Sequence, residues 1–80
     1  MKKAVHITPR QRQVTILVAN GLTNREIADR FHISVRTVEV HRLQVMKRLK
    51  SKNVAQLIRS AIEHDIVKAS TFAKRRKRAQ

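Results

Sequence analysis

Several residue types are missing or rare in this sequence of 80 residues. Cysteine is absent, which excludes disulfide bonds, thiolate metal sites and cysteine nucleophiles. A single glycine leaves no glycine-rich phosphate loop, and no apolar run approaches the roughly 18 residues of a membrane span. The first residues also lack the apolar stretch of a secretory signal. We therefore expect a cytoplasmic chain without disulfides or a membrane anchor.

Aromatic residues are equally scarce, since Phe31 and Phe72 are the only two. Proteins that bind single-stranded nucleic acid or RNA usually stack bases on aromatic side chains. This scarcity favours duplex DNA over RNA if the partner is a nucleic acid.

Acidic residues are few, with 5 Asp and Glu against 19 Lys and Arg, for a net charge of +14. Eight basic residues lie at the two ends, so residues 4–67 keep 11 basic and all five acidic residues, a net charge of +6. A polyanion such as nucleic acid is the first partner to consider. The unbroken basic run 74–78 should be disordered when free. It is either a solubilising tail or an arm along a phosphate backbone.

The residues that could carry chemistry are dispersed. The four histidines form no His-x₃-His pair, and the five acids are scattered over three predicted helices. We therefore expect no metal, no cofactor and no enzymatic activity. His41 is expected to be a packed residue with one nitrogen on a backbone or phosphate oxygen.

Helix-capping patterns predict an all-α chain. Thr8 and Gln11 read as a capping box before a first helix that starts at Pro9 and ends at Asn20-Gly21. Thr23 with Glu26 starts a short helix to residue 30. Two further starts follow: Ser34 begins a helix over 35–49, and a box at 53–56 begins one that runs through residue 62.

The short spacing between the second and third predicted helices is that of a helix-turn-helix, whose second helix enters the major groove. On a helical wheel, Val38, Val45 and Leu49 form a buried stripe flanked by Val35 and Met46. The opposite face carries Arg36, Glu39, Val40, Leu43 and Lys47. Isolated exposed apolar residues are common and need no function. The alternative is a groove-facing surface, with apolar contacts to thymine methyls and a carboxylate that accepts from cytosine N4.

The fourth predicted helix carries two apolar rows where one would cover so small a domain. One row is Ala55, Ile58 and Ile62, and the other is Val54, Leu57 and Ala61. Either the helix is deeply buried or one row is a homodimer surface. The sequence does not decide which row is exposed, and Ile66, Val67 and Phe72 either extend that surface or lie against the domain.

Several strings in order resemble the LuxR/GerE-type helix-turn-helix, and the resemblance covers residues 7–67 without gaps. They are Thr8-Pro9-Arg10, then Gly21-Leu22-Thr23-Asn24-Arg25-Glu26-Ile27-Ala28, then Ile33-Ser34, Arg36-Thr37-Val38-Glu39-Val40-His41-Arg42 and Met46-Lys47-Arg48-Leu49. The 36–42 string is especially similar to the FixJ-like response-regulator branch.

This resemblance implies a four-helix, duplex-DNA-binding transcription regulator that acts as a dimer. The scaffold helix would be 24–30 and the recognition helix 35–49. The predicted base-reading residues are Arg36, Glu39, Val40 and Leu43. The predicted phosphate contacts are Thr23, Asn24, Arg25, Thr37, Arg42, Lys47 and Lys52. The predicted dimer interface is Val54, Leu57, Ile58 and Ala61.

The sequence departs from the family pattern at several positions. His32 and Lys50 stand where the family often has glycine, and Gln11 and Gln13 stand where it often has glutamate. Leu43 replaces a residue that is polar or basic in many relatives, which changes the expected operator.

These observations divide the chain into a basic segment 1–6, a helix-turn-helix domain 7–67 and a basic tail 68–80. Because no receiver or ligand domain precedes residue 7, the expectation is a stand-alone regulator on the bacterial nucleoid, with RNA polymerase as a further partner. The alternatives are an excised output domain, a small basic adaptor on an acidic protein, or an RNA binder.

Overall fold

Four α-helices form the secondary structure of residues 6–68, the part of the chain that the computed structural model describes. They are α1 (Pro9–Ala19), α2 (Asn24–Phe31), α3 (Val35–Arg48) and α4 (Val54–Glu63), and no strand occurs among the described residues. The all-α prediction is confirmed, with helix ends within one or two residues of those expected. The predictions for the basic run 74–78 and for Phe72 lie outside the described residues.

Each helix begins at a side chain that caps its backbone N–H groups. In α1 and α2 the capping boxes are complete: Thr8 and Gln11 bond reciprocally at 3.1 Å, and Thr23 N donates to Glu26 Oε1 at 2.8 Å. Ser34 accepts from the backbone at the start of α3. These bonds satisfy N–H groups that have no partner within their own helix.

The start of α4 differs from the predicted box. Asn53 Oδ1 accepts from Gln56 N at 2.9 Å, as expected, but Gln56 Oε1 accepts from Lys52 N at 2.8 Å instead of the Asn53 N–H. The cap is therefore present, and its reciprocal bond lies one residue earlier in the chain.

Among residues 6–68, three non-glycine residues adopt positive φ where the chain leaves a helix. His32 has φ of 56° at the end of α2, and Lys50 has φ of 52° after α3. Both are positions where the family often has glycine, so the backbone keeps a conformation that favours glycine. Asp65 adopts φ of 60° after α4, which the sequence did not indicate.

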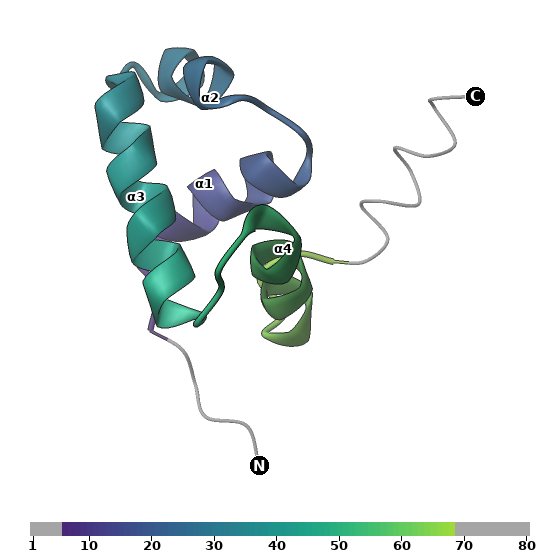
Figure 1. Cartoon of the computed structure of the whole chain (residues 1–80). Coiled ribbons are helices and arrows are strands. Elements are labelled where there is room, and N and C mark those ends of the chain that lie inside the picture. The colour runs from purple at the N-terminus through teal and green to yellow at the C-terminus, as the bar shows by residue number, and fades with distance from the viewer. Residues whose placement is uncertain (1–5, 69–80) are drawn as a thin grey trace, which may run out of the picture.

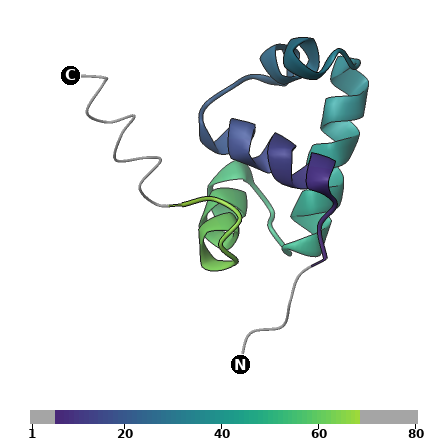
Figure 2. The same ribbon diagram turned by 180° about the vertical axis from the view of Figure 1, so that it is seen from behind.

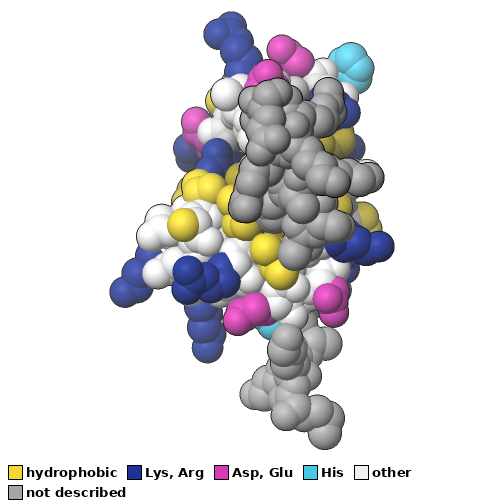
Figure 3. Space-filling model, turned by 90° about the vertical axis from the view of Figure 1, so that its right-hand side faces the viewer, with side chains coloured by type: hydrophobic (Ala, Val, Ile, Leu, Met, Phe, Trp, Pro, Cys, Tyr) yellow, Lys and Arg dark blue, Asp and Glu magenta, His cyan; other side chains and the backbone are white. Residues whose placement is uncertain are grey.

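The helices pack so that α1 crosses behind α3 (Figures 1 and 2). The N-terminal half of α3 also carries α2, and α4 lies on the opposite side of α1 from α2 (Figure 1). Apolar side chains reach the surface on the right-hand side of that view, between basic and acidic groups (Figure 3). No described helix has both the length and the apolarity to cross a membrane.

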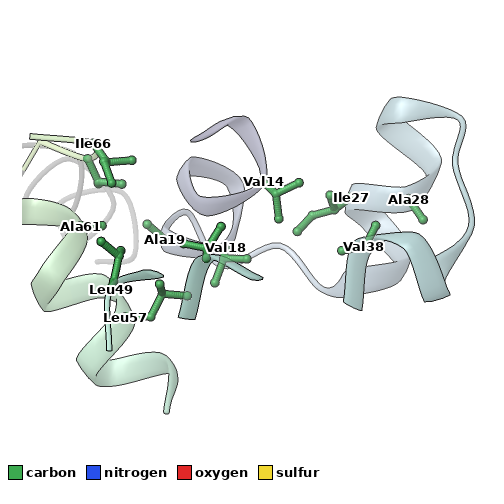
Figure 4. Close-up of a cluster of buried hydrophobic side chains, with 12 residues drawn as sticks. Val14, Val18, Ala19, Ile27, Ala28, Val38, Leu49, Leu57, Ala61 and Ile66 are labelled. Carbon is green, nitrogen blue, oxygen red and sulfur yellow. The ribbon is translucent and has the colours of Figure 1, made fainter. Parts of the chain in front are cut away.

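The core joins all four helices in one cluster (Figure 4). The members are Val14, Val18, Ala19, Ile27, Ala28, Val38, Val45, Leu49, Leu57, Ala61, Ile66 and Val67. Val38, Val45 and Leu49 of the predicted stripe are thus buried, whereas its flanks are not: Met46 is partly buried and Val35, in the first turn of the helix, is 38% exposed.

The core also decides between the two rows of α4. Leu57 and Ala61 are 1% and 0% exposed, so they hold the domain together. The prediction that they form a dimer interface is wrong, because their side chains are already packed inside the chain. Ile66 and Val67 are buried too, and so they lie against the domain rather than extend its surface.

Candidate nucleic-acid interface

The helix-turn-helix is held by apolar contacts between α2 and α3. Ile27 and Val38 are fully buried, and Ile27 lies between Ala28 on one side and Val14 of α1 on the other (Figure 4). His32 ends α2 in the left-handed conformation, and Ser34 caps α3 two residues later. The turn is short because His32 reverses the direction of the chain and Ser34 is already the N-cap of the next helix.

The face of α3 opposite this packing is open to solvent. Leu43 is 60% exposed, Lys47 is exposed and Val40 is partly exposed. The Arg36 and Glu39 side chains are 78% and 44% exposed and form an ion pair at 3.6 Å. The four predicted base-reading residues therefore share one surface. The ion pair adds a coupling between two of them, since a change at Glu39 also releases Arg36.

A shallow depression of about 280 Å³ lies between the start of α2 and the exposed face of α3. Its lining residues are Asn24, Glu39, Arg42, Leu43 and Met46. It therefore brings together two predicted base readers and two predicted phosphate contacts. Met46 was predicted only as a flank of the buried stripe, and its long flexible side chain reaches the depression from the border of that stripe.

Asn24 and Arg42 bond to each other across this depression. Arg42 NH1 donates to Asn24 Oδ1 at 2.6 Å, and both side chains are partly buried. The bond ties the first residue of α2 to the middle of α3 and uses the Asn24 oxygen, leaving the Asn24 amide N–H₂ and other guanidinium N–H groups as donors.

The other predicted phosphate contacts occupy separate places. Thr23 caps α2, and the Thr37 hydroxyl lies 2.8 Å from the Ser34 hydroxyl in the first turn of α3. Arg25 and Lys47 are exposed on α2 and α3. Lys52 is exposed in the loop before α4 and lies outside the depression. The structure thus distributes the predicted phosphate donors over both helices and one loop.

Two polar features were not expected from the sequence. Gln11 is 7% exposed, and its Nε2 donates to Gln44 Oε1 on α3 at 2.9 Å. No sequence pattern pairs residues this far apart. His41 is packed as predicted, but its Nδ1 is buried and has no hydrogen-bond partner among the described residues.

The described residues contain no group of three or more His, Cys, Asp or Glu side chains that would hold a metal ion. Polar and cationic groups at helix starts, with an exposed mixed face on one helix, are instead suited to contacts with a polyanion.

The family model described as bacterial regulatory proteins, luxR family, matches residues 5–61. The chain belongs to this family. The match runs from just before α1 into α4, so the LuxR-family domain includes the whole helix-turn-helix. The resemblance stated from the sequence is confirmed.

Curated relatives agree with this assignment. The chain is 51% identical over 53 residues to the tetrathionate response regulatory protein TtrR of Salmonella typhimurium, which covers 66% of this chain and 26% of TtrR. It is 46% identical over 56 residues to the transcriptional regulatory protein FixJ of Rhizobium meliloti, covering 70% of this chain and 28% of FixJ. The uncharacterized response regulatory protein YgeK of Escherichia coli is 41% identical over 56 residues, covering 70% of this chain and 38% of YgeK. The LuxR-family domain thus spans between a quarter and two fifths of these relatives.

Proposed function

We propose that this LuxR-family domain binds duplex DNA sequence-specifically and regulates transcription, with α3 in the major groove. The observation that carries the proposal is the exposed face of α3, where Leu43 is 60% exposed and Val40 is partly exposed between Arg36 and Lys47. A helix turned to water gains nothing by exposing Leu43 to 60%, whereas thymine methyl groups offer apolar contact in the groove.

The Arg36–Glu39 ion pair refines how this face reads bases. Glu39 would accept from cytosine N4, or it would hold Arg36 in place for guanine O6 and N7. Both roles use the Glu39 carboxylate, and the second also uses its 3.6 Å contact with Arg36. When the carboxylate is removed, the first role predicts a lost preference for the cytosine that Glu39 contacts. The second predicts a lost preference for the guanine that Arg36 contacts.

The phosphate contacts would fix the position of α3 without reading sequence. Thr23, Asn24 and Arg42 lie around the start of α2, whose free N–H groups favour anions. Thr37 and Lys47 would contact the backbone beside α3, Arg25 from α2 and Lys52 from the loop before α4.

Two copies would pair through the outer side of α4. Val54 is 38% exposed and Ile58 is partly exposed, next to Ala55 and Ile62 on the outer row. With Leu57 and Ala61 removed from the predicted interface, these four residues are the apolar surface that remains for a second copy. RNA polymerase is the further protein partner that we propose for transcription control.

Two arrangements of the whole protein follow from the sequence, a stand-alone regulator and the output domain of a longer one. Relatives named as response regulatory proteins, of which the chain spans a minor part, support the output-domain arrangement. An immunoblot of native cell extract distinguishes them by the size of the protein that contains this domain.

Selection of bound sequences from a random duplex pool tests the proposal. We expect a defined consensus, and inverted half-sites if two copies pair. Glu39→Gln and Glu39→Ala would be selected in parallel, because the glutamine side chain keeps an oxygen acceptor while both substitutions remove the ion pair. If Glu39 reads cytosine directly, Glu39→Ala should relax one base pair by about 1–3 kcal/mol, with Glu39→Gln closer to wild type. An identical relaxation in both variants indicates that Glu39 acts through Arg36, and the absence of any consensus contradicts sequence-specific binding.

A further inference from the structure

A second depression lies between α1 and the end of α2, away from the exposed face of α3. It measures about 230 Å³ and is lined by Gln13, Ile16, Leu17, Arg30 and Phe31. We name this depression the α1/α2 groove. No residue of α3 or α4 lines it, so the α1/α2 groove is separate from both the proposed DNA surface and the proposed dimer surface.

The floor of the α1/α2 groove is apolar. Ile16, Leu17 and Phe31 pack against the core while each keeps part of its side chain exposed. Three adjoining, incompletely covered large apolar residues are a feature that marks interaction sites more often than scattered exposed ones do. Burial of this apolar surface would stabilise the binding of a partner that inserts an apolar side chain.

Arg30 lines the same groove, and Arg10 lies outside its lining but contacts the Phe31 ring. The Arg10 guanidinium lies 4.1 Å from the centre of the Phe31 ring, and its NH1 is buried with no hydrogen-bond acceptor among the described residues. Arg30 is exposed, and its side chain makes no hydrogen bond or ion pair with any residue in 6–68. A carboxylate in the groove would therefore meet the exposed guanidinium of Arg30, next to a Phe31 ring that Arg10 holds in place.

Charge and shape together limit the classes of molecule that could bind in the groove. A second copy of this chain, at +14, would bring like charge to Arg10 and Arg30. A DNA backbone would leave the apolar floor without a partner, because phosphates and sugars offer it little. A protein segment with a large apolar side chain next to Asp or Glu would contact the apolar floor with the first side chain and Arg30 with the second.

We propose that the α1/α2 groove docks a short acidic segment of another protein, anchored by one large apolar side chain. Because the groove and the face of α3 belong to different elements, the segment and duplex DNA would bind at the same time. The inference goes beyond the proposed DNA binding and does not depend on it.

The test begins with selection of random displayed peptides on the full chain, at about 0.15 M salt to weaken non-specific attraction to its positive charge. Enriched peptides are then synthesised with a fluorescent label, and their Kd is measured by anisotropy. Arg30→Glu and Gln13→Glu place acid at the groove by changing exposed side chains, so neither disturbs the core. Arg59→Glu makes the matched charge reversal on the exposed side of α4.

We expect enriched peptides to combine a large apolar residue with Asp or Glu. Arg30→Glu should weaken them about tenfold, Gln13→Glu should weaken them as well, and Arg59→Glu should leave Kd within about twofold of wild type. Saturating duplex DNA should not displace the peptides. If the chain binds no duplex, the peptide Kd values measured on the free chain still test the proposal. The proposal is overturned if no such peptide is enriched, if Arg30→Glu and Arg59→Glu act equally, or if DNA displaces the peptide.

Discussion

Replacing Leu43 by alanine separates a role in DNA binding from a role in folding. Leu43 is 60% exposed and does not belong to the core cluster. Alanine is also the better helix former. We therefore expect Leu43→Ala to change the free energy of unfolding by no more than about 0.5 kcal/mol.

The effect on binding should be larger, because the exposed part of the side chain is what a base edge would cover. The substitution removes three carbon atoms, and a buried methylene contributes about 0.8 kcal/mol. Allowing for incomplete burial at the interface, we expect a loss of about 1–2 kcal/mol. That loss corresponds to a Kd about five- to thirtyfold weaker.

Two measurements on the same preparations check this prediction: urea unfolding for stability, and anisotropy with a selected and a scrambled duplex for affinity. The loss should appear on the selected duplex and be small on the scrambled one. Val45→Ala is the control, because Val45 is fully buried on the other side of α3. It should lower stability by about 1.5–3 kcal/mol and leave the preferred sequence unchanged. Equal loss on both duplexes, or none, would refute base contact by Leu43.

Three further changes test other parts of the structure. Lys52→Ala should weaken binding to every duplex alike and reduce the slope of log K against log salt by about one, and an unchanged slope would show that Lys52 touches no phosphate. His32→Gly should raise the free energy of unfolding by about 1 kcal/mol in urea, because His32 holds a φ of 56°, and a lower value would mean that its side chain stabilises the turn. Ala55→Asp should weaken self-association in sedimentation experiments with little loss of stability, because Ala55 is exposed, whereas Leu57→Ala should cost about 2–5 kcal/mol of stability. The reverse pattern would contradict the assignment of the outer row to the dimer surface.

The helix starts could be predicted from the sequence because capping is local. Thr8, Thr23 and Ser34 each bond within three residues, so their roles depend on neighbours that the sequence displays. The buried stripe of α3 was equally accessible, since a regular helix fixes which of its residues share a face. The positive φ at His32 and Lys50 falls where the family resemblance places glycine, whereas nothing in the sequence marked Asp65.

The tertiary structure decided what depends on residues far apart in the sequence. Both rows of α4 are apolar, and only the packing of α4 on the core shows that Leu57 and Ala61 face inward. The bonds from Gln11 to Gln44 and from Arg42 to Asn24 join residues on different helices, where no sequence period links the partners. The α1/α2 groove, formed by two elements that meet only in the folded chain, belongs to the same class.

The caps, the apolar stripe of α3 and the short spacing before it were thus sufficient to predict an all-α chain with a helix-turn-helix. Those features depend on contacts within one helical turn and on which residues share a helix face. Which apolar residues remain outside after the helices pack depends on the shared core. The sequence already indicated the face of α3 that bears Leu43, and the folded core shows that this side chain stays 60% exposed while Val38, Val45 and Leu49 are buried.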